Sequence, residues 1–184
     1  TYEPAPAQMQ NLGAAAVYFA IGMPAEENFI LGGIGENTKL VRLQNEVNET
    51  YAPLTFENGE ADLHIWLSPR RVKVMVGAIA REMGALYPEH AETFFANAKA
   101  YGERLDALDA AIHEKLDGLA QRTFIAYHPA FGYFADDYGL VMLALEEEGK
   151  EATARHMQEV VDFAKTQNIR VIFYQEETAG RQAE

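Results

Sequence analysis

Short apolar runs alternate with amphipathic stretches along most of the chain. The apolar runs contain Val, Ile, Phe and Tyr and are bounded by turn residues, which is typical of buried strands. They lie at 14–21, 39–43, 123–127, 140–145 and 169–174. Helical patterns occupy 6–12, 25–34, 68–86, 130–138 and 153–167. Strands separated by helices predict parallel βαβ units, and therefore an α/β fold.

The longest helical pattern runs from Pro88 to about Asp117. Its apolar residues recur at spacings of three and four and predict one buried stripe, formed by Phe94, Ala98, Tyr101, Leu105, Leu108 and Ile112. At 1.5 Å per residue, a helix of about 30 residues measures about 45 Å, which is more than one compact lobe of this size needs. We therefore expect this helix to link two lobes.

These patterns predict three segments. Residues 1–67 are expected to form part of an N-terminal α/β lobe, with an acidic, turn-rich loop over 45–62. Residues 68–118 are expected to be helical and to include the linking helix 88–117, and residues 119–184 to form part of a C-terminal α/β lobe. The chain begins with Thr rather than Met and ends in what looks like the start of a helix, so we expect it to be part of a longer precursor.

Composition narrows the classes of partner. A chain of 184 residues with 48% apolar and 23% charged residues can bury a core of its own. Lys and Arg number 15 against 28 for Asp and Glu, and the resulting charge of -13 repels nucleic acids and anionic membranes and favours cations as partners. The absence of cysteine excludes thiolate and iron-sulfur sites built from this chain, and no apolar stretch has the ~20 residues that a membrane-spanning helix needs.

Two of the five histidines occupy positions suited to binding or catalysis. His128 directly follows the predicted strand 123–127, and ligands of α/β proteins bind at the carboxyl ends of such strands. His64 lies just before the helix start that Ser68 and Pro69 predict. For both, a structural loop histidine is the alternative interpretation. The remaining histidines are interpreted as solvated helix positions: His90, His113 and His156.

Other candidate groups are weaker. The acidic runs 146–148 and 176–177 could hold a hard cation, although such runs are more often solvated loops. The glycine-rich segment 32–35 lacks the preceding strand and the following Lys of a phosphate-binding loop. Imidazole suits zinc, but zinc takes four ligands. Two histidines therefore need a carboxylate, a water or ligands from outside this chain.

Four segments carry a family resemblance: TYEP at 1–4, DLHIWLSP at 62–69, AYHPAFGYFADDYGL at 126–140, and VIFYQEE followed by RQAE near the end. In this order they resemble the metal-binding class of periplasmic solute-binding proteins that serve ABC transporters, the ZnuA and TroA-like group. The resemblance implies two α/β lobes with parallel sheets, joined by a long, rigid backbone helix. The chain would be a truncated form of this architecture.

The resemblance also implies metal ligands. His64 matches the family's histidine in the DxHxW segment and His128 the one in HPAFGYF, so both would bind the metal directly. Relatives that resemble manganese carriers commonly have a carboxylate at the second position, so histidine there favours Zn²⁺ over Mn²⁺. A further histidine of the family would lie just before Thr1, and a carboxylate that some members use would lie beyond residue 184. Asp62 or Glu176 are candidates to orient the rings.

The resemblance leads us to expect a non-enzymatic protein of the periplasm or cell exterior that binds Zn²⁺ as its transported ligand and delivers it to an ABC membrane permease. A lipid anchor on the precursor is compatible with this role. Since imidazole must be neutral to bind a metal, zinc affinity should fall below about pH 6.5. Two alternatives stay open. One is a metal-dependent hydrolase, for which the chain shows no recognised nucleophile or base motif, and the other is a surface adhesin, a role described for relatives.

Overall fold

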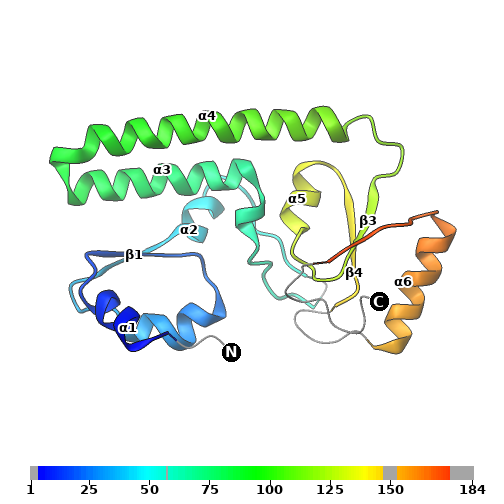
Figure 1. Cartoon of the computed structure of the whole chain (residues 1–184), viewed down its shortest axis with the longest axis horizontal. Coiled ribbons are helices and arrows are strands. Elements are labelled where there is room, and N and C mark those ends of the chain that lie inside the picture. The colour runs from blue at the N-terminus through cyan, green and yellow to red at the C-terminus, as the bar shows by residue number, and fades with distance from the viewer. Residues whose placement is uncertain (1–3, 57, 147–152, 175–184) are drawn as a thin grey trace. The chain divides into compact units, whose positions relative to one another are not determined.

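A computed structural model describes residues 4–56, 58–146 and 153–174 (Figure 1). The chain divides into two compact units. The first contains the described residues up to Ile65 together with Pro69–Ala107, and the second contains Trp66–Ser68 together with the described residues from Leu108 onward. Each unit has its own parallel sheet. The prediction of an α/β fold with parallel strands is therefore confirmed.

The sheet of the first unit pairs two strands in parallel, β1 (Val17–Ala20) and β2 (Lys39–Arg42). Helix α1 (Pro6–Gly13) precedes β1, and two short turns, η1 (Glu26–Ile30) and η2 (Leu31–Gly33), connect the strands. The predicted helix over 25–34 is thus a π turn followed by a 3-10 turn. Its glycine-rich end explains the difference, because glycine is a poor residue for continuing an α-helix.

The segment 45–62 is only partly a loop. Its start belongs to helix α2 (Leu43–Asn48), in which Leu43 and Val47 are buried. Farther along, Thr55 and Ala61 form an isolated antiparallel bridge. The prediction of a loop is therefore wrong for residues 45–48. It relied on the acidic composition, whereas the four-residue spacing of the two apolar side chains is typical of a helix.

Helix α3 (Pro69–Leu86) begins where the Ser-Pro pair predicts. A 3-10 turn, η4 (Pro88–His90), leads into the longest helix, α4 (Ala91–Leu116). The two helices run side by side within the first unit (Figure 1), where Nζ of Lys73 on α3 lies 2.6 Å from Oδ2 of Asp106 on α4. Helix α4 then continues into the second unit from Leu108. The segment boundaries near residues 67 and 118 stay predictions.

The buried face of α4 differs from the predicted stripe. Leu105 is buried as expected, but Tyr101 and Leu108 are 46% and 48% exposed, and Gly102 is buried instead. A Cβ atom added to Gly102 would lie 3.5 Å from Cε of Lys73, within ordinary contact distance. The helix therefore turns a glycine, rather than the neighbouring tyrosine, toward the long methylene stem of a lysine on α3.

The sheet of the second unit has the order β4-β3-β5, all parallel: β3 (Thr123–Ala126), β4 (Val141–Ala144) and β5 (Ile172–Phe173). Two helices accompany it, α5 (Gly132–Asp137) and α6 (Ala154–Thr166). Its core consists of Ile125, Tyr127, Leu145 and Val160, with Leu143, Ala164 and Ile169 packed against it. On α6, Val160 is buried, whereas the neighbouring Val161 is 39% exposed.

Candidate metal centre

The first candidate ligand, His64, is held by the aspartate two residues before it. Its Nδ1 lies 2.7 Å from Oδ1 of Asp62, and the same oxygen accepts the backbone N–H of His64 at 2.9 Å. The Asp62 side chain is 3% exposed and the His64 side chain 15%. An aspartate readily binds the backbone two residues onward, so the D-x-H spacing itself brings the carboxylate to the ring.

The second candidate, His128, lies just beyond the carboxyl end of β3, as predicted. The parallel register pairs Ala126 of β3 with Ala144 of β4. The two segments stay paired beyond the ends of these strands, because the backbone N–H of Glu146 donates to the carbonyl of Tyr127 at 2.8 Å. His128 and Glu146, each two residues beyond its strand, therefore come together. Nδ1 of His128 lies 2.7 Å from Oε2 of Glu146.

The two histidines thus share one arrangement, with a carboxylate at Nδ1. An ionised carboxylate only accepts hydrogen bonds, so a neutral ring beside it carries its proton on Nδ1 and its lone pair on Nε2. Metal-binding histidines in proteins commonly use one ring nitrogen for the metal and donate the other N–H to a carboxylate. Nε2 is therefore the atom of each ring that is suited to coordinate a metal.

His64 belongs to the first unit and His128 to the second, so the surroundings of each histidine are described separately. Over residues 4–56, 58–146 and 153–174, no three side chains of His, Cys, Asp or Glu come together as a metal-binding group. The ligand assignment of these two histidines therefore stays a prediction. Four acidic candidates lie outside the described residues: Glu147, Glu148, Glu176 and Glu177.

The remaining histidines have other environments. His90 is 64% exposed and His113 is 44% exposed, in agreement with the solvated positions predicted for them. His156 was expected to be solvated as well, but it is partly buried, and its Nε2 lies 2.9 Å from the carbonyl oxygen of Ala144. That expectation is wrong because the first turn of α6 brings this ring against the last residue of β4.

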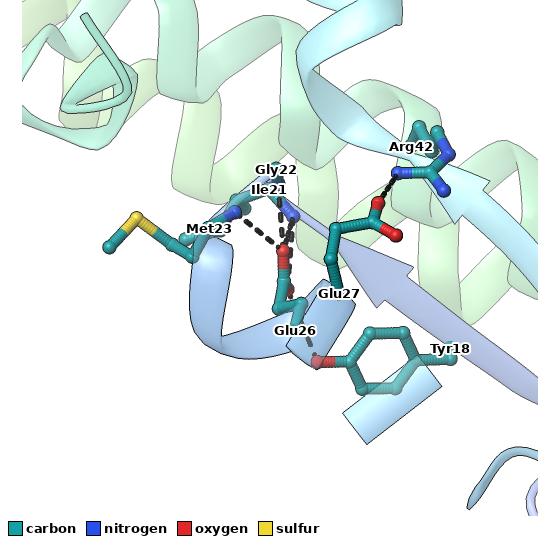
Figure 2. A network of polar contacts seen from close by, with 7 residues as sticks. All are labelled: Tyr18, Ile21, Gly22, Met23, Glu26, Glu27 and Arg42. Carbon is teal, nitrogen blue, oxygen red and sulfur yellow. Dashed lines mark hydrogen bonds and ion pairs between the residues drawn. The ribbon is translucent and has the colours of Figure 1, made fainter. Parts of the chain in front are cut away.

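A buried carboxylate that the sequence pattern did not reveal lies in the first unit. Glu26 is 7% exposed, and Figure 2 shows it at the turn that follows β1. Its oxygens accept the hydroxyl of Tyr18 at 3.1 Å and three successive backbone N–H groups, those of Ile21 at 3.1 Å, Gly22 at 2.8 Å and Met23 at 2.9 Å. Since these donors come from the chain itself, this carboxylate stabilises the turn.

The second unit also contains an apolar cavity of about 380 Å³. Phenylalanine and leucine side chains form most of its lining: Leu116, Leu119, Phe124, Phe131, Phe134, Leu140 and Phe173, together with Gln121, Arg122 and Thr123. None of these side chains is a histidine or a carboxylate. The cavity is therefore separate from the two candidate ligands.

Comparison with known proteins assigns the chain to a family. All residues from 1 to 184 match the family model described as ZnuA, zinc-uptake complex component A, periplasmic. The chain belongs to this ZnuA family. The family resemblance predicted from the sequence is confirmed.

Two curated relatives of the ZnuA family illustrate the similarity. The zinc-binding lipoprotein AdcA of Streptococcus pneumoniae is 40% identical over 119 residues, which cover 64% of this chain and 24% of AdcA. The high-affinity zinc uptake system protein ZnuA of Brucella abortus is 36% identical over 118 residues, which cover 62% of this chain and 35% of that protein. The matched part thus spans 24% to 35% of these relatives.

Solved structures of ZnuA confirm the fold. A crystal structure of ZnuA superposes with a TM-score of 0.83 at 36% identity, and the match covers 95% of this chain and 68% of that one. A ZnuA deletion mutant with zinc bound gives a TM-score of 0.87 at 33% identity, covering 100% and 70% of the two chains. The predicted ZnuA and TroA-like architecture, truncated relative to these structures, is therefore confirmed.

Proposed function

We propose that this protein captures Zn²⁺ outside the cytoplasmic membrane and delivers it to an ABC-type permease. Membership in a zinc-uptake family supports the proposal, as do relatives named for zinc binding and zinc uptake. The observation that carries it is the shared geometry of His64 and His128, each with Nδ1 at 2.7 Å from a carboxylate oxygen. This is the orientation that a metal-binding imidazole needs.

In this proposal, His64 and His128 are both zinc ligands, and each coordinates the metal through Nε2. Imidazole nitrogen is a preferred zinc ligand, and water or ligands outside the described residues complete the four ligands that zinc takes. Mn²⁺ is the weaker candidate, because it favours oxygen ligands. The metal is cargo here, so the site has to bind it tightly and also release it.

The proposed location and attachment rest on the relatives. The family model is described as periplasmic and AdcA as a lipoprotein, which supports a place outside the cytoplasm and, more specifically, a lipid anchor on the precursor. In the part of the chain that the structure describes, no helix is both long enough and apolar enough to cross a membrane. The charge of -13 favours attraction of cations to the surface.

A zinc titration against a chromophoric chelator tests the proposal. It uses the longest chain that the gene encodes, without an affinity tag, together with His64→Ala and His128→Ala, and with His90→Ala as an exposed control. We expect saturable one-to-one binding that weakens at least about tenfold in the first two variants and is unchanged in the control. Failure to compete for zinc would overturn the function, and equal binding without either histidine would overturn the ligand assignment.

The two alternative functions gain less support. The names of the relatives describe zinc binding and uptake rather than catalysis, which favours the expectation of no enzymatic activity over a hydrolase. The laminin-binding protein of Streptococcus agalactiae, described as an adhesin with metal-transporting activity, superposes with a TM-score of 0.82 but is only 22% identical. That likeness extends to the fold alone, so adhesion stays an untested prediction.

A further inference from the structure

Glu146 contacts the ring of His128 because the two residues follow neighbouring strands of the sheet. Its side chain is 17% exposed and that of His128 is 27% exposed, so water competes only partly for their 2.7 Å contact. The backbone fixes both residues, because Leu145 donates to the carbonyl of Ala126 at 3.0 Å and Glu146 to that of Tyr127 at 2.8 Å. Parallel backbone hydrogen bonds that continue beyond the strands therefore place the carboxylate beside the ring.

We propose that Glu146 is a positioning residue, which holds His128 with its proton on Nδ1 and its lone pair on Nε2 before any metal arrives. Asp62 performs the same task for His64 from a local turn. The inference that Nε2 then receives zinc rests on the proposed function, whereas the proton assignment rests on the hydrogen bonds alone. The two carboxylates thus prepare both rings in the same protonation pattern from unrelated local structures.

The chain provides an internal reference for the opposite pattern. In His156, Nε2 lies 2.9 Å from the carbonyl oxygen of Ala144. A carbonyl oxygen only accepts hydrogen bonds, so the proton of the neutral His156 ring lies on Nε2. A single spectrum of one protein can therefore compare both proton placements under identical conditions.

Preparing the ring affects zinc binding in two ways. A fixed ring loses less rotational freedom when the metal binds, and a carboxylate at Nδ1 raises the electron density at Nε2. Loss of such a partner typically lowers metal affinity about 10- to 100-fold. Glu146→Ala removes the acceptor, whereas Glu146→Gln keeps an oxygen that can accept from Nδ1 but removes the charge. The glutamine variant should therefore lose less affinity than the alanine variant.

Nuclear magnetic resonance of the metal-free, ¹⁵N-labelled protein tests the proton assignment. Long-range ¹H–¹⁵N correlation spectra connect the carbon-bound protons of each imidazole ring with both ring nitrogens. They are recorded at about pH 8, where histidine side chains are ordinarily neutral. We expect Nδ1–H for His128 and His64, and Nε2–H for His156. In Glu146→Ala, His128 should lose its Nδ1–H preference while His64 keeps it. The control Glu159→Ala, which changes an exposed residue of α6, should alter neither ring.

The zinc titration of the same variants separates this inference from the proposed function. We expect Glu146→Ala to weaken zinc binding about 10- to 100-fold and Glu146→Gln to weaken it less. An Nε2–H proton on His128 in the unaltered protein, or an unchanged His128 signal in Glu146→Ala, would overturn the positioning role even if zinc binds tightly. If the protons lie as expected but the protein does not bind zinc, the positioning role stands and the proposed function fails. The spectrum of the unaltered protein decides the proton assignment even if a variant does not fold.

Discussion

The hydroxyl of Ser68 donates a hydrogen bond to Oδ2 of Asp137 at 2.5 Å, although 69 positions separate the two residues. Both side chains belong to the second unit, where Ser68 is fully buried and Asp137 is 8% exposed. O–H···O⁻ bonds of this length are typical of charge-assisted hydrogen bonds. The serine that the sequence identifies as a helix start therefore also ties the Trp66–Ser68 segment to the last residue of α5.

We predict that Ser68→Ala lowers the free energy of unfolding by about 1–3 kcal/mol, because Asp137 then stays buried with one donor fewer. Urea denaturation followed by circular dichroism measures the loss. Thr166→Ala is the matched control, since it removes an exposed hydroxyl that donates to a carbonyl within α6. That control should change stability by less than about 0.5 kcal/mol. Equal losses in both variants would contradict the importance of the Ser68 bond.

We also predict that Glu26→Gln destabilises the first unit by about 1–3 kcal/mol. The amide nitrogen of glutamine cannot accept, so part of the N–H cluster at the turn after β1 loses its acceptor (Figure 2). Urea denaturation gives the stability, and hydrogen exchange at Gly22 reports on the turn itself.

The neighbouring Glu27→Gln serves as the control for Glu26→Gln. Glu27 is 53% exposed and pairs with Arg42 at 2.6 Å (Figure 2), and exposed ion pairs contribute at most about 1 kcal/mol. Its loss should leave the Gly22 amide protected from exchange. If Gly22 exchanges equally fast in both variants, the buried carboxylate is not what holds the turn.

Local patterns were sufficient to predict most elements and both candidate histidines. The position of His128 follows from a strand pattern that ends one residue before it, and the carboxylate for His64 lies only two residues away in the sequence. Both relationships join residues that are close together in the sequence, so periodicity and spacing are enough to predict them. The ZnuA-like resemblance added the metal, which the residue spacing alone leaves open.

The partner of His128 could not be predicted, because it depends on which strands are neighbours. Glu146 contacts the ring of His128 only because β4 pairs with β3 in a register that places Ala144 opposite Ala126. In the sequence, Glu146 is one of three adjacent acidic residues, and the candidates predicted to orient the rings were Asp62 and Glu176 instead. The burial of Gly102 in place of Tyr101 has a similar origin, because the packing of α4 against a lysine stem decides which residue faces inward.

Close backbone packing leads to a prediction about the glycine-rich segment. A Cβ atom on Gly35 would lie 2.4 Å from the carbonyl oxygen of Gly13, which belongs to the backbone and cannot move aside cheaply. Gly35→Ala should therefore destabilise the first unit by about 1–3 kcal/mol, as overpacking commonly does. At Gly32 no atom lies within 4 Å of the added Cβ, so Gly32→Ala should be neutral within about 1 kcal/mol. Thermal denaturation of both variants checks the contrast, and a harmless Gly35→Ala would refute it.

The ion pair between Lys39 and Glu82 should make part of the first unit's stability depend on pH. A hydrogen bond from Lys39 lowers the pKa of Glu82 below its ordinary value of 4.5, and the positive charges of Lys39 and Arg81 act in the same direction. A carboxyl whose pKa is lower in the folded state stabilises the fold above its unfolded pKa, and it loses this contribution as the pH falls through the folded value.

The stability difference between the unaltered protein and Glu82→Gln should therefore be present at pH 7, at no more than about 1 kcal/mol, because the lysine is half exposed. It should shrink as the pH is lowered from about 4.5 toward 3. Urea denaturation at several pH values measures the difference directly. Repeating the comparison in a Lys39→Gln background removes the main donor, so Glu82→Gln should then have a smaller effect at pH 7. A difference that stays constant down to acidic pH, or that persists at full size without Lys39, would show that the carboxyl at position 82 stabilises the fold by some means other than this ion pair.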